Sequence, residues 1–185
     1  MPDFDYRALF DSLCLEAGLV CRLSFDMPEA YEEANGMYDP ETDTVFVNAT
    51  SLKGCSDSQK AFYLFHELRH AEQYAHPERF PPAIRKALDY DIAYDGNCSK
   101  RVNGQWVSCR LDGGEDRFTR LYLSQPHEID ANQFAYAKAK TLFGGDEALE
   151  SLRSFWIPSV IVSMEEYDAI CSEIDKALIG LKAQS

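Results

Sequence analysis

The sequence predicts a helix-rich α+β fold in a single domain spanning residues 1–185. Three observations favour this prediction. Apolar residues recur at helical spacing over most of the chain, β-branched and aromatic runs are few and short, and the length suits one domain of ordinary size. A hydrophobic fraction of 45% is enough to form a core and excludes general disorder. The short strands predict a small mixed or antiparallel sheet.

The N-terminal part predicts one helix followed by two strands. Residues 4–17 place their apolar side chains on one helical face, and Gly18 is a typical residue to end that helix. Residues 20–25 are predicted to form a short strand. Residues 38–43 have the composition of a turn, and residues 44–48 form a second strand of β-branched and aromatic side chains.

A longer helix is predicted over residues 57–74. Ser56 and Gln59 have the spacing of a capping box, in which each side chain binds a backbone N–H at the helix start. The apolar stripe of this helix is distinct from a second, mostly polar face, which is formed by Phe62, His66, Arg69, His70 and Gln73. We therefore expect the apolar face of this helix to pack in the core and the polar face to lie outside it.

The next helix is predicted to begin at the proline pair Pro81 and Pro82. Ile84, Leu88 and Ile92 follow at intervals of four residues, which is typical of one helical face. Three further helices are predicted near the C-terminus, over residues 126–140, 146–155 and 163–181.

Residues 95–116 are rich in glycine, asparagine, aspartate and charge, and are predicted to form an insertion outside the core. Asn103-Gly104 is a strong signal for a two-residue β-hairpin turn. Cys98 and Cys109 lie symmetrically about this turn, in a pair whose Cα separation of about 5.5 Å would allow a disulfide. A reducing cytoplasm would keep both as thiols, so both states remain open.

Charge and hydropathy exclude some classes of function. Eighteen Lys and Arg stand against 31 Asp and Glu, a formal net charge of −13, which opposes binding to nucleic acid backbones. No apolar run approaches the roughly 18–20 residues needed to cross a bilayer, and the N-terminus lacks the pattern of a secretory signal. We therefore expect a cytoplasmic protein without membrane or nucleic acid partners; the oligomeric state is open.

One motif carries chemistry: residues 66–70 read His-Glu-Leu-Arg-His, the H-E-x-x-H pattern. Residues four apart on a helix lie on the same face, so His66 and His70 can reach one metal ion. Neutral imidazoles suit zinc, and Glu67 is placed to take a proton from a metal-bound water. Half of the four histidines in the chain fall within these five residues. The pattern predicts a zinc site with Glu67 as the catalytic base.

A catalytic zinc site needs a third protein ligand, and the sequence offers two. Glu128 is favoured, because it begins a predicted helix on which small alanines allow close packing. Asn132, one turn later, could accept a hydrogen bond from a ligand imidazole. His76 has the spacing of metzincin peptidases, but Gln73 stands where that pattern needs a glycine.

Four stretches of the chain carry a family resemblance: Gly36–Pro40, Thr44–Asn48, His66–His70 and Glu128–Ala135. In this order they resemble the ImmA/IrrE-type metallopeptidases, which are small gluzincins of phage, mobile elements and bacterial stress regulation. The resemblance implies a zincin-like fold with one Zn²⁺ per chain, bound by His66, His70 and Glu128, and with Glu67 as base. It also implies a protein substrate such as a transcriptional repressor. The gap before Glu128 is longer than is usual in that family, and no helix-turn-helix accompanies the domain.

The sequence thus predicts a zinc-dependent endopeptidase acting on a protein or peptide. The strand at residues 44–48 is expected to pair with an extended substrate. Tyr122 is retained as a candidate to stabilise the oxyanion, although the sequence does not separate it from His127, Arg120 and Tyr74. One alternative is a catalytically silent protein of the same fold that acts by binding a protein partner. Another is a metzincin-like secreted peptidase that uses His76.

Overall fold

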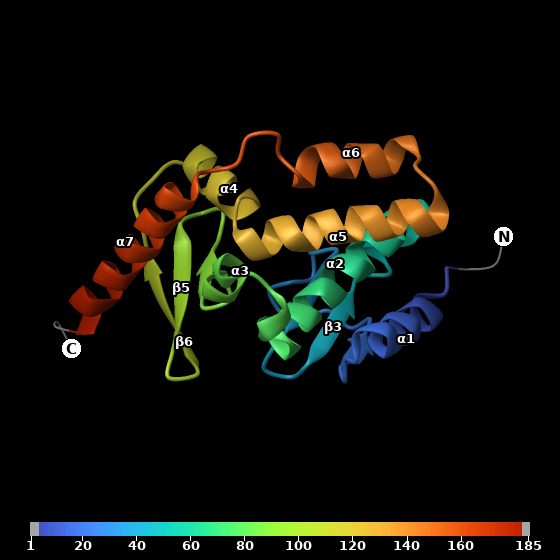
Figure 1. The fold of residues 1–185 in the computed structure, drawn as a ribbon, viewed down its shortest axis with the longest axis horizontal. Coiled ribbons are helices and arrows are strands. Elements are labelled where there is room, and N and C mark those ends of the chain that lie inside the picture. The colour runs from blue at the N-terminus through green and yellow to red at the C-terminus, as the bar shows by residue number, and fades with distance from the viewer. Residues whose placement is uncertain (1–3, 183–185) are drawn as a thin grey trace. The chain divides into compact units, whose positions relative to one another are not determined.

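The computed structural model describes residues 4–182, which divide into two compact units (Figure 1). The first unit contains the chain up to Phe80 together with Asp130–Ile157, and the second contains Pro81–Ile129 together with the chain from Pro158 onward. Each unit has a hydrophobic core of its own. The two units are described separately below.

The predicted α+β class is confirmed. Over residues 4–182 the chain forms seven α-helices and two sheets of three strands each. The sheet of the first unit is mixed, with strand order β1-β3-β2, and the sheet of the second unit is antiparallel, with order β4-β5-β6. None of the helices in this part of the chain is both long and apolar enough to cross a membrane.

The first unit begins with a helix and the mixed sheet. Helix α1 ends where predicted, because Gly18 adopts a left-handed conformation with φ of 71° and caps it. Strand β3 lies in the middle of the sheet, parallel to β1 and antiparallel to β2. The bounds of these elements are α1 Tyr6–Ala17, β1 Arg22–Ser24, β2 Gly36–Asp39 and β3 Thr44–Val47, followed by the short 3₁₀ helix η1 Ser51–Gly54.

Strand β2 shows where the predicted turn was wrong. Residues 38–43 were expected to form a turn, but Tyr38 and Asp39 belong to β2 and pair with Val45 and Thr44 of β3. The turn itself is confined to the residues between the two strands. A strand of four residues forms its backbone hydrogen bonds with a neighbouring strand. The composition of those four residues is therefore only a weak predictor of the strand.

Helix α2, Asp57–Ala75, carries the H-E-x-x-H motif and starts with the predicted capping box. Ser56 Oγ accepts from the Gln59 backbone N–H, and the Gln59 side chain accepts from the Ser56 N–H. The helix continues through Gln73, and His76 caps its C-terminus. It packs on α1, β2, β3 and α6, all within the first unit. The remaining elements of this unit are η2 Pro77–Arg79 and α6 Glu147–Trp156.

The second unit contains the antiparallel sheet, with α4 against β4 and α7 against β5 and β6. The hairpin is confirmed: Asn103 and Gly104 both have positive φ, and Val102 faces Gln105. Cys98 lies opposite Cys109 as predicted, and both are buried free thiols. The elements are α3 Pro82–Ala87, β4 Tyr90–Ile92, β5 Asn97–Val102, β6 Gln105–Arg110, α4 Glu115–Leu123 and α7 Met164–Lys182.

One prediction for the second unit was wrong, and one helix was missed. The helix that starts at Pro82 ends at Ala87, and Ile92 lies in β4 instead of on the same helix. The recurring apolar residues reflect burial in two different elements, since β4 pairs with β5. Helix α4 was not predicted at all, although Phe118 and Leu121 form its buried side.

Helix α5, Pro126–Phe143, is shared between the units: it begins in the second and enters the first at Asp130. Its predicted start is correct, and it runs three residues beyond the predicted end. Three alanines on it are fully buried, as expected for a helix that packs closely: Ala131, Ala135 and Ala139.

Candidate metal centre

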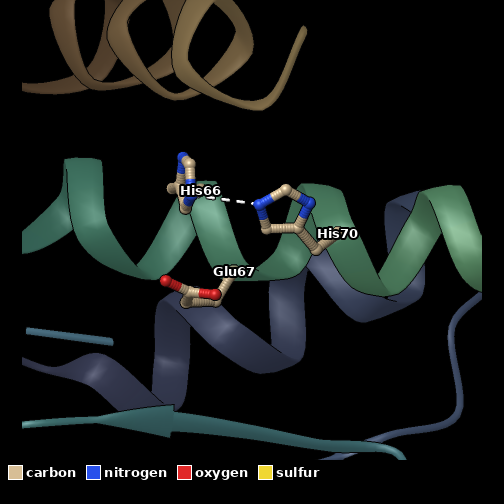
Figure 2. Close-up of side chains that lie close together, drawn as sticks. All are labelled: His66, Glu67 and His70. Atoms are coloured by element: carbon tan, nitrogen blue, oxygen red, sulfur yellow. Dashed lines mark hydrogen bonds between the residues drawn. The ribbon is translucent and has the colours of Figure 1, made fainter. Parts of the chain in front are cut away.

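The two histidines of the motif lie one turn apart on α2 and present the same ring nitrogen to each other (Figure 2). The distance between His66 Nε2 and His70 Nε2 is 3.0 Å. Two imidazole nitrogens bound to one tetrahedral zinc ion would be about 3.3 Å apart, given Zn–N bonds of about 2.0–2.1 Å. The pair is therefore close to the separation that a shared metal ion requires.

Glu67 completes the group. His66, Glu67 and His70 each offer one ligand atom, and these three atoms lie within 4.8 Å of one another. Glu67 is only 6% exposed, and its carboxylate lies beside the histidine pair (Figure 2). Glu67 is the carboxylate of the three residues, and a carboxylate so placed can accept a proton from a water and release it again.

Strand β2 leaves the space that Glu67 occupies. A Cβ atom at Gly36 would lie 2.9 Å from both Cγ and Oε1 of Glu67, closer than side chains pack. Gly36 is the first residue of β2, so the start of this strand lies directly against the Glu67 carboxylate. The absence of a side chain at residue 36 is what allows this arrangement.

The ring nitrogen of His70 that faces away from His66, Nδ1, is hydrogen-bonded to a glutamine. His70 Nδ1 lies 2.9 Å from Gln73 Oε1, and Gln73 Nε2 donates to Asp130 Oδ2 at 2.9 Å. Gln73 is fully buried and His70 is buried. His66 is half-buried, with its ring stacked on Phe62 at a centroid distance of 6.3 Å. The two imidazoles therefore have different surroundings.

Asp130 is also bound by an arginine of α2. Arg69 donates to it twice, from Nε to Oδ2 at 2.7 Å and from Nη2 to Oδ1 at 3.1 Å. Arg69 Nη1 donates to Glu72 Oε2 at 2.6 Å. Burial alone would lower the pKa of Arg69, but the hydrogen bonds and charges of Asp130 and Glu72 raise it above its usual value.

The guanidinium of Arg69 is enclosed on its faces as well. It lies 4.6 Å from the ring centroid of Phe80 and 4.7 Å from that of Phe134. These contacts fix its plane, and with it the two-point pairing to Asp130.

Glu128 lies in the second unit, in the first turn of α5, and is buried. Within that unit its Oε1 is 3.6 Å from His127 Nε2. Burial and the negative charge of Glu128 raise the pKa of Asp91. They also raise the pKa of Tyr94 to about 12, against a hydrogen bond with Tyr122 that lowers it. Glu128 thus has the buried, oxygen-donor character of a metal ligand, and its role as the third ligand stays a prediction.

Asn132 was expected to support a ligand imidazole, and the structure gives it a hydrogen bond to another group. Its Nδ2 donates to the backbone oxygen of Trp156 at 3.2 Å.

The acceptor beside His70 is Gln73, a role that sequence reasoning missed. A signal existed, because Gln73 follows His70 by three residues and shares its helical face. Asp130, 57 residues further along, had no such signal.

The other candidates are distributed over both units. In the second unit, Tyr122 stacks on Tyr94 with ring centroids 4.1 Å apart, and Arg120 pairs with Glu166 at 2.7 Å. In the first unit, Tyr74 lies against Tyr38 at a centroid distance of 5.8 Å.

His76 is engaged at the end of α2, where its Nε2 lies 3.3 Å from the Gly18 carbonyl oxygen. Within residues 4–182, the group of potential ligands that contains His66 and His70 has Glu67 as its other member and does not include His76.

Comparisons of the chain with protein-family models, curated proteins and solved structures gave no match. The chemistry of this centre therefore rests on its own residues and their geometry.

Proposed function

We propose that the protein is a zinc-dependent endopeptidase. The observation that carries the proposal is the 3.0 Å approach of His66 Nε2 to His70 Nε2 on α2, with the buried Glu67 carboxylate beside them. Without a metal, one Nε2–H donates to the other Nε2, and the same approach places both nitrogens within reach of one ion. The Glu67 carboxylate lies where it can take a proton from a water bound to that ion.

A bound zinc ion would supply a water of lowered pKa and polarise the carbonyl of the scissile bond. Glu67 then does the proton chemistry: its carboxylate accepts the proton from the attacking water and delivers it to the leaving amine nitrogen. Its burial next to Gly36 holds the carboxylate in one place, so little reorganisation is needed when the proton moves.

Glu128 is our proposed third ligand, alongside His66 and His70. The support is chemical: catalytic zinc sites take three protein ligands, and a buried carboxylate near a second acid favours a nearby cation. Glu128 also lies two residues before Asp130, which Arg69 and Gln73 of α2 bind in the first unit.

The substrate is proposed to be an extended segment of a protein, as the resemblance to ImmA/IrrE-type peptidases implies. The strand expected to receive it, residues 44–48, was the wrong choice, because β3 has strands on both sides. Among the residues described, β2 pairs only with β3, so its other edge can add a substrate strand. This edge starts at Gly36, next to Glu67.

The first test is the metal content of the purified protein and three variants, measured by elemental analysis. We expect one zinc per chain in the wild type and in His76→Ala, and loss of zinc in His66→Ala and Glu128→Ala. Absence of zinc from the wild type, even after zinc is added at neutral pH, would overturn the proposal. If Glu128→Ala retains its zinc, Glu128 is not the third ligand, and the rest of the proposal stands.

The second test separates an enzyme from a protein that only binds a partner. Glu67→Gln should keep its zinc and lose about 10²–10⁴-fold in kcat/KM on a cleaved peptide, because the general base is gone. Cleavage is measured by mass spectrometry of a peptide library, with exposed Glu78→Gln as the matched control. Cleavage that survives in Glu67→Gln would exclude this residue as the base.

A further inference from the structure

The hydrogen bonds around Gln73 determine which nitrogen of His70 carries its proton. A carboxylate only accepts hydrogen bonds, so the group of Gln73 that faces Asp130 must be its NH₂. The carbonyl oxygen of Gln73 then faces His70, at 2.9 Å. A carbonyl oxygen also only accepts, so His70 Nδ1 must carry the hydrogen. The lone pair of the neutral ring is left on Nε2, the nitrogen that faces His66.

This arrangement is fixed at its far end. Asp130 cannot rotate to release Gln73 without breaking its two hydrogen bonds with Arg69. Arg69 is in turn held by Glu72 and by the rings of Phe80 and Phe134. Gln73 itself is fully buried, so water does not compete for its amide.

We propose that Gln73 and Asp130 are positioning residues for the metal centre: they hold His70 in the Nδ1-protonated tautomer with Nε2 directed at the metal. The inference rests on the proposed metal site and adds to it a device that sequence reasoning did not identify. Because a neutral amide separates the carboxylate from the imidazole, Asp130 acts through orientation and only weakly through its charge.

The first experiment measures zinc affinity by competition with a chromophoric chelator. Gln73→Met keeps the approximate volume but removes the acceptor, so zinc affinity should fall by about 10–100-fold. Exposed Gln133→Met on α5 is the matched control and should bind zinc as the wild type does. Equal zinc affinity in Gln73→Met and the wild type would overturn the inference and leave the peptidase proposal intact.

The tautomer is also observed directly, without activity and without metal. In ¹⁵N-labelled protein, long-range ¹H–¹⁵N spectra distinguish a protonated Nδ1 from a protonated Nε2. We expect His70 to be Nδ1-protonated in the metal-free wild type and a mixture of tautomers in Gln73→Met. A predominantly Nε2-protonated His70 in the wild type would overturn the inference, even if the protein bound no zinc and the proposed function had failed.

Discussion

Gly36 is the residue of β2 on which the Glu67 carboxylate depends most directly. Substitution by alanine would place Cβ 2.9 Å from Glu67 Cγ, so the carboxylate must shift. We predict that Gly36→Ala lowers kcat/KM by about 10–100-fold, because small displacements of a catalytic group are costly. Zinc affinity should change little, since Glu67 is not proposed as a ligand. Steady-state kinetics and chelator competition measure the two quantities.

The matched control for this prediction is Gly54→Ala. A Cβ there meets nothing within 4 Å, and Gly54 does not have a positive φ. Its kinetics should equal those of the wild type. If Gly36→Ala were as active as Gly54→Ala, the close contact with Glu67 would have no functional consequence.

We predict that the thiol of Cys21 is alkylated faster than the thiols of the buried cysteines. Its sulfur lies 3.6 Å from that of Cys14. The hydrogen bond from Cys14 lowers the pKa of Cys21 against the effect of burial, while burial raises the pKa of Cys98 to about 12. At pH 7–8, iodoacetamide should modify Cys21 before the buried thiols Cys98, Cys109 and Cys171, as followed by peptide mass mapping.

The donor can be tested by substitution. Cys14→Ala removes the hydrogen bond and should slow labelling of Cys21, whereas Cys14→Ser keeps a donor and should preserve it. Labelling of Cys21 that is no faster in the wild type than in Cys14→Ala would argue against this hydrogen bond.

At the scale of elements, Asp146 joins two helices of the first unit. It caps α6 by accepting from the Leu149 N–H at 2.7 Å, and it accepts from Ser58 Oγ of α2 at 2.6 Å. These hydrogen bonds, that of Ser58 first, lower the pKa of Asp146. Asp146→Ala should reduce the free energy of unfolding by about 1 kcal/mol, a usual value for a helix cap.

The pH dependence follows from the direction of this shift. A carboxylate whose pKa is lower in the folded than in the unfolded state stabilises the folded state fully at pH values above its pKa in the unfolded state. This contribution is lost as the pH falls through its pKa in the folded state. The difference between wild type and Asp146→Ala in urea unfolding should therefore be complete above about pH 5 and shrink towards pH 2. A difference that is constant with pH would contradict the assignment.

Elements with a local signal were predictable, and elements that need a partner were not. The capping box at Ser56 and the glycine at 18 act within a few residues, so the C-terminal end of α1 and the start of α2 follow from the sequence. Strand β2 is four residues long and β4 is three, and each is stabilised by pairing with another segment. The false extension of α3 to Ile92 arose because burial in a sheet produced the same spacing as a helical face.

At the scale of the whole molecule, zinc binding should stabilise the fold. A ligand present at 100 times its Kd stabilises the state that binds it by about 2.7 kcal/mol. For a chain of this length, that corresponds to a rise in Tm of roughly 5–10 °C. Differential scanning fluorimetry should show this rise in the wild type with added zinc, and a chelator should reverse it. His76→Ala should keep the shift and His66→Ala should lose it; a shift retained in His66→Ala would mean that zinc binds elsewhere.

By itself, the sequence determined the α+β class, most helix positions, the hairpin at Asn103-Gly104 and the pairing of His66 with His70. All of these depend on residues within a few positions of one another, where helix and turn geometry impose the spacing. Only the tertiary structure decided which strand has a free edge, that Gly36 makes room for Glu67, and that Gln73 and Asp130 orient His70. The contacts of Gly36 with Glu67 and of Gln73 with Asp130 join residues about 30 to 60 positions apart. Their partners are chosen by the packing of whole elements, which no local pattern in the chain records.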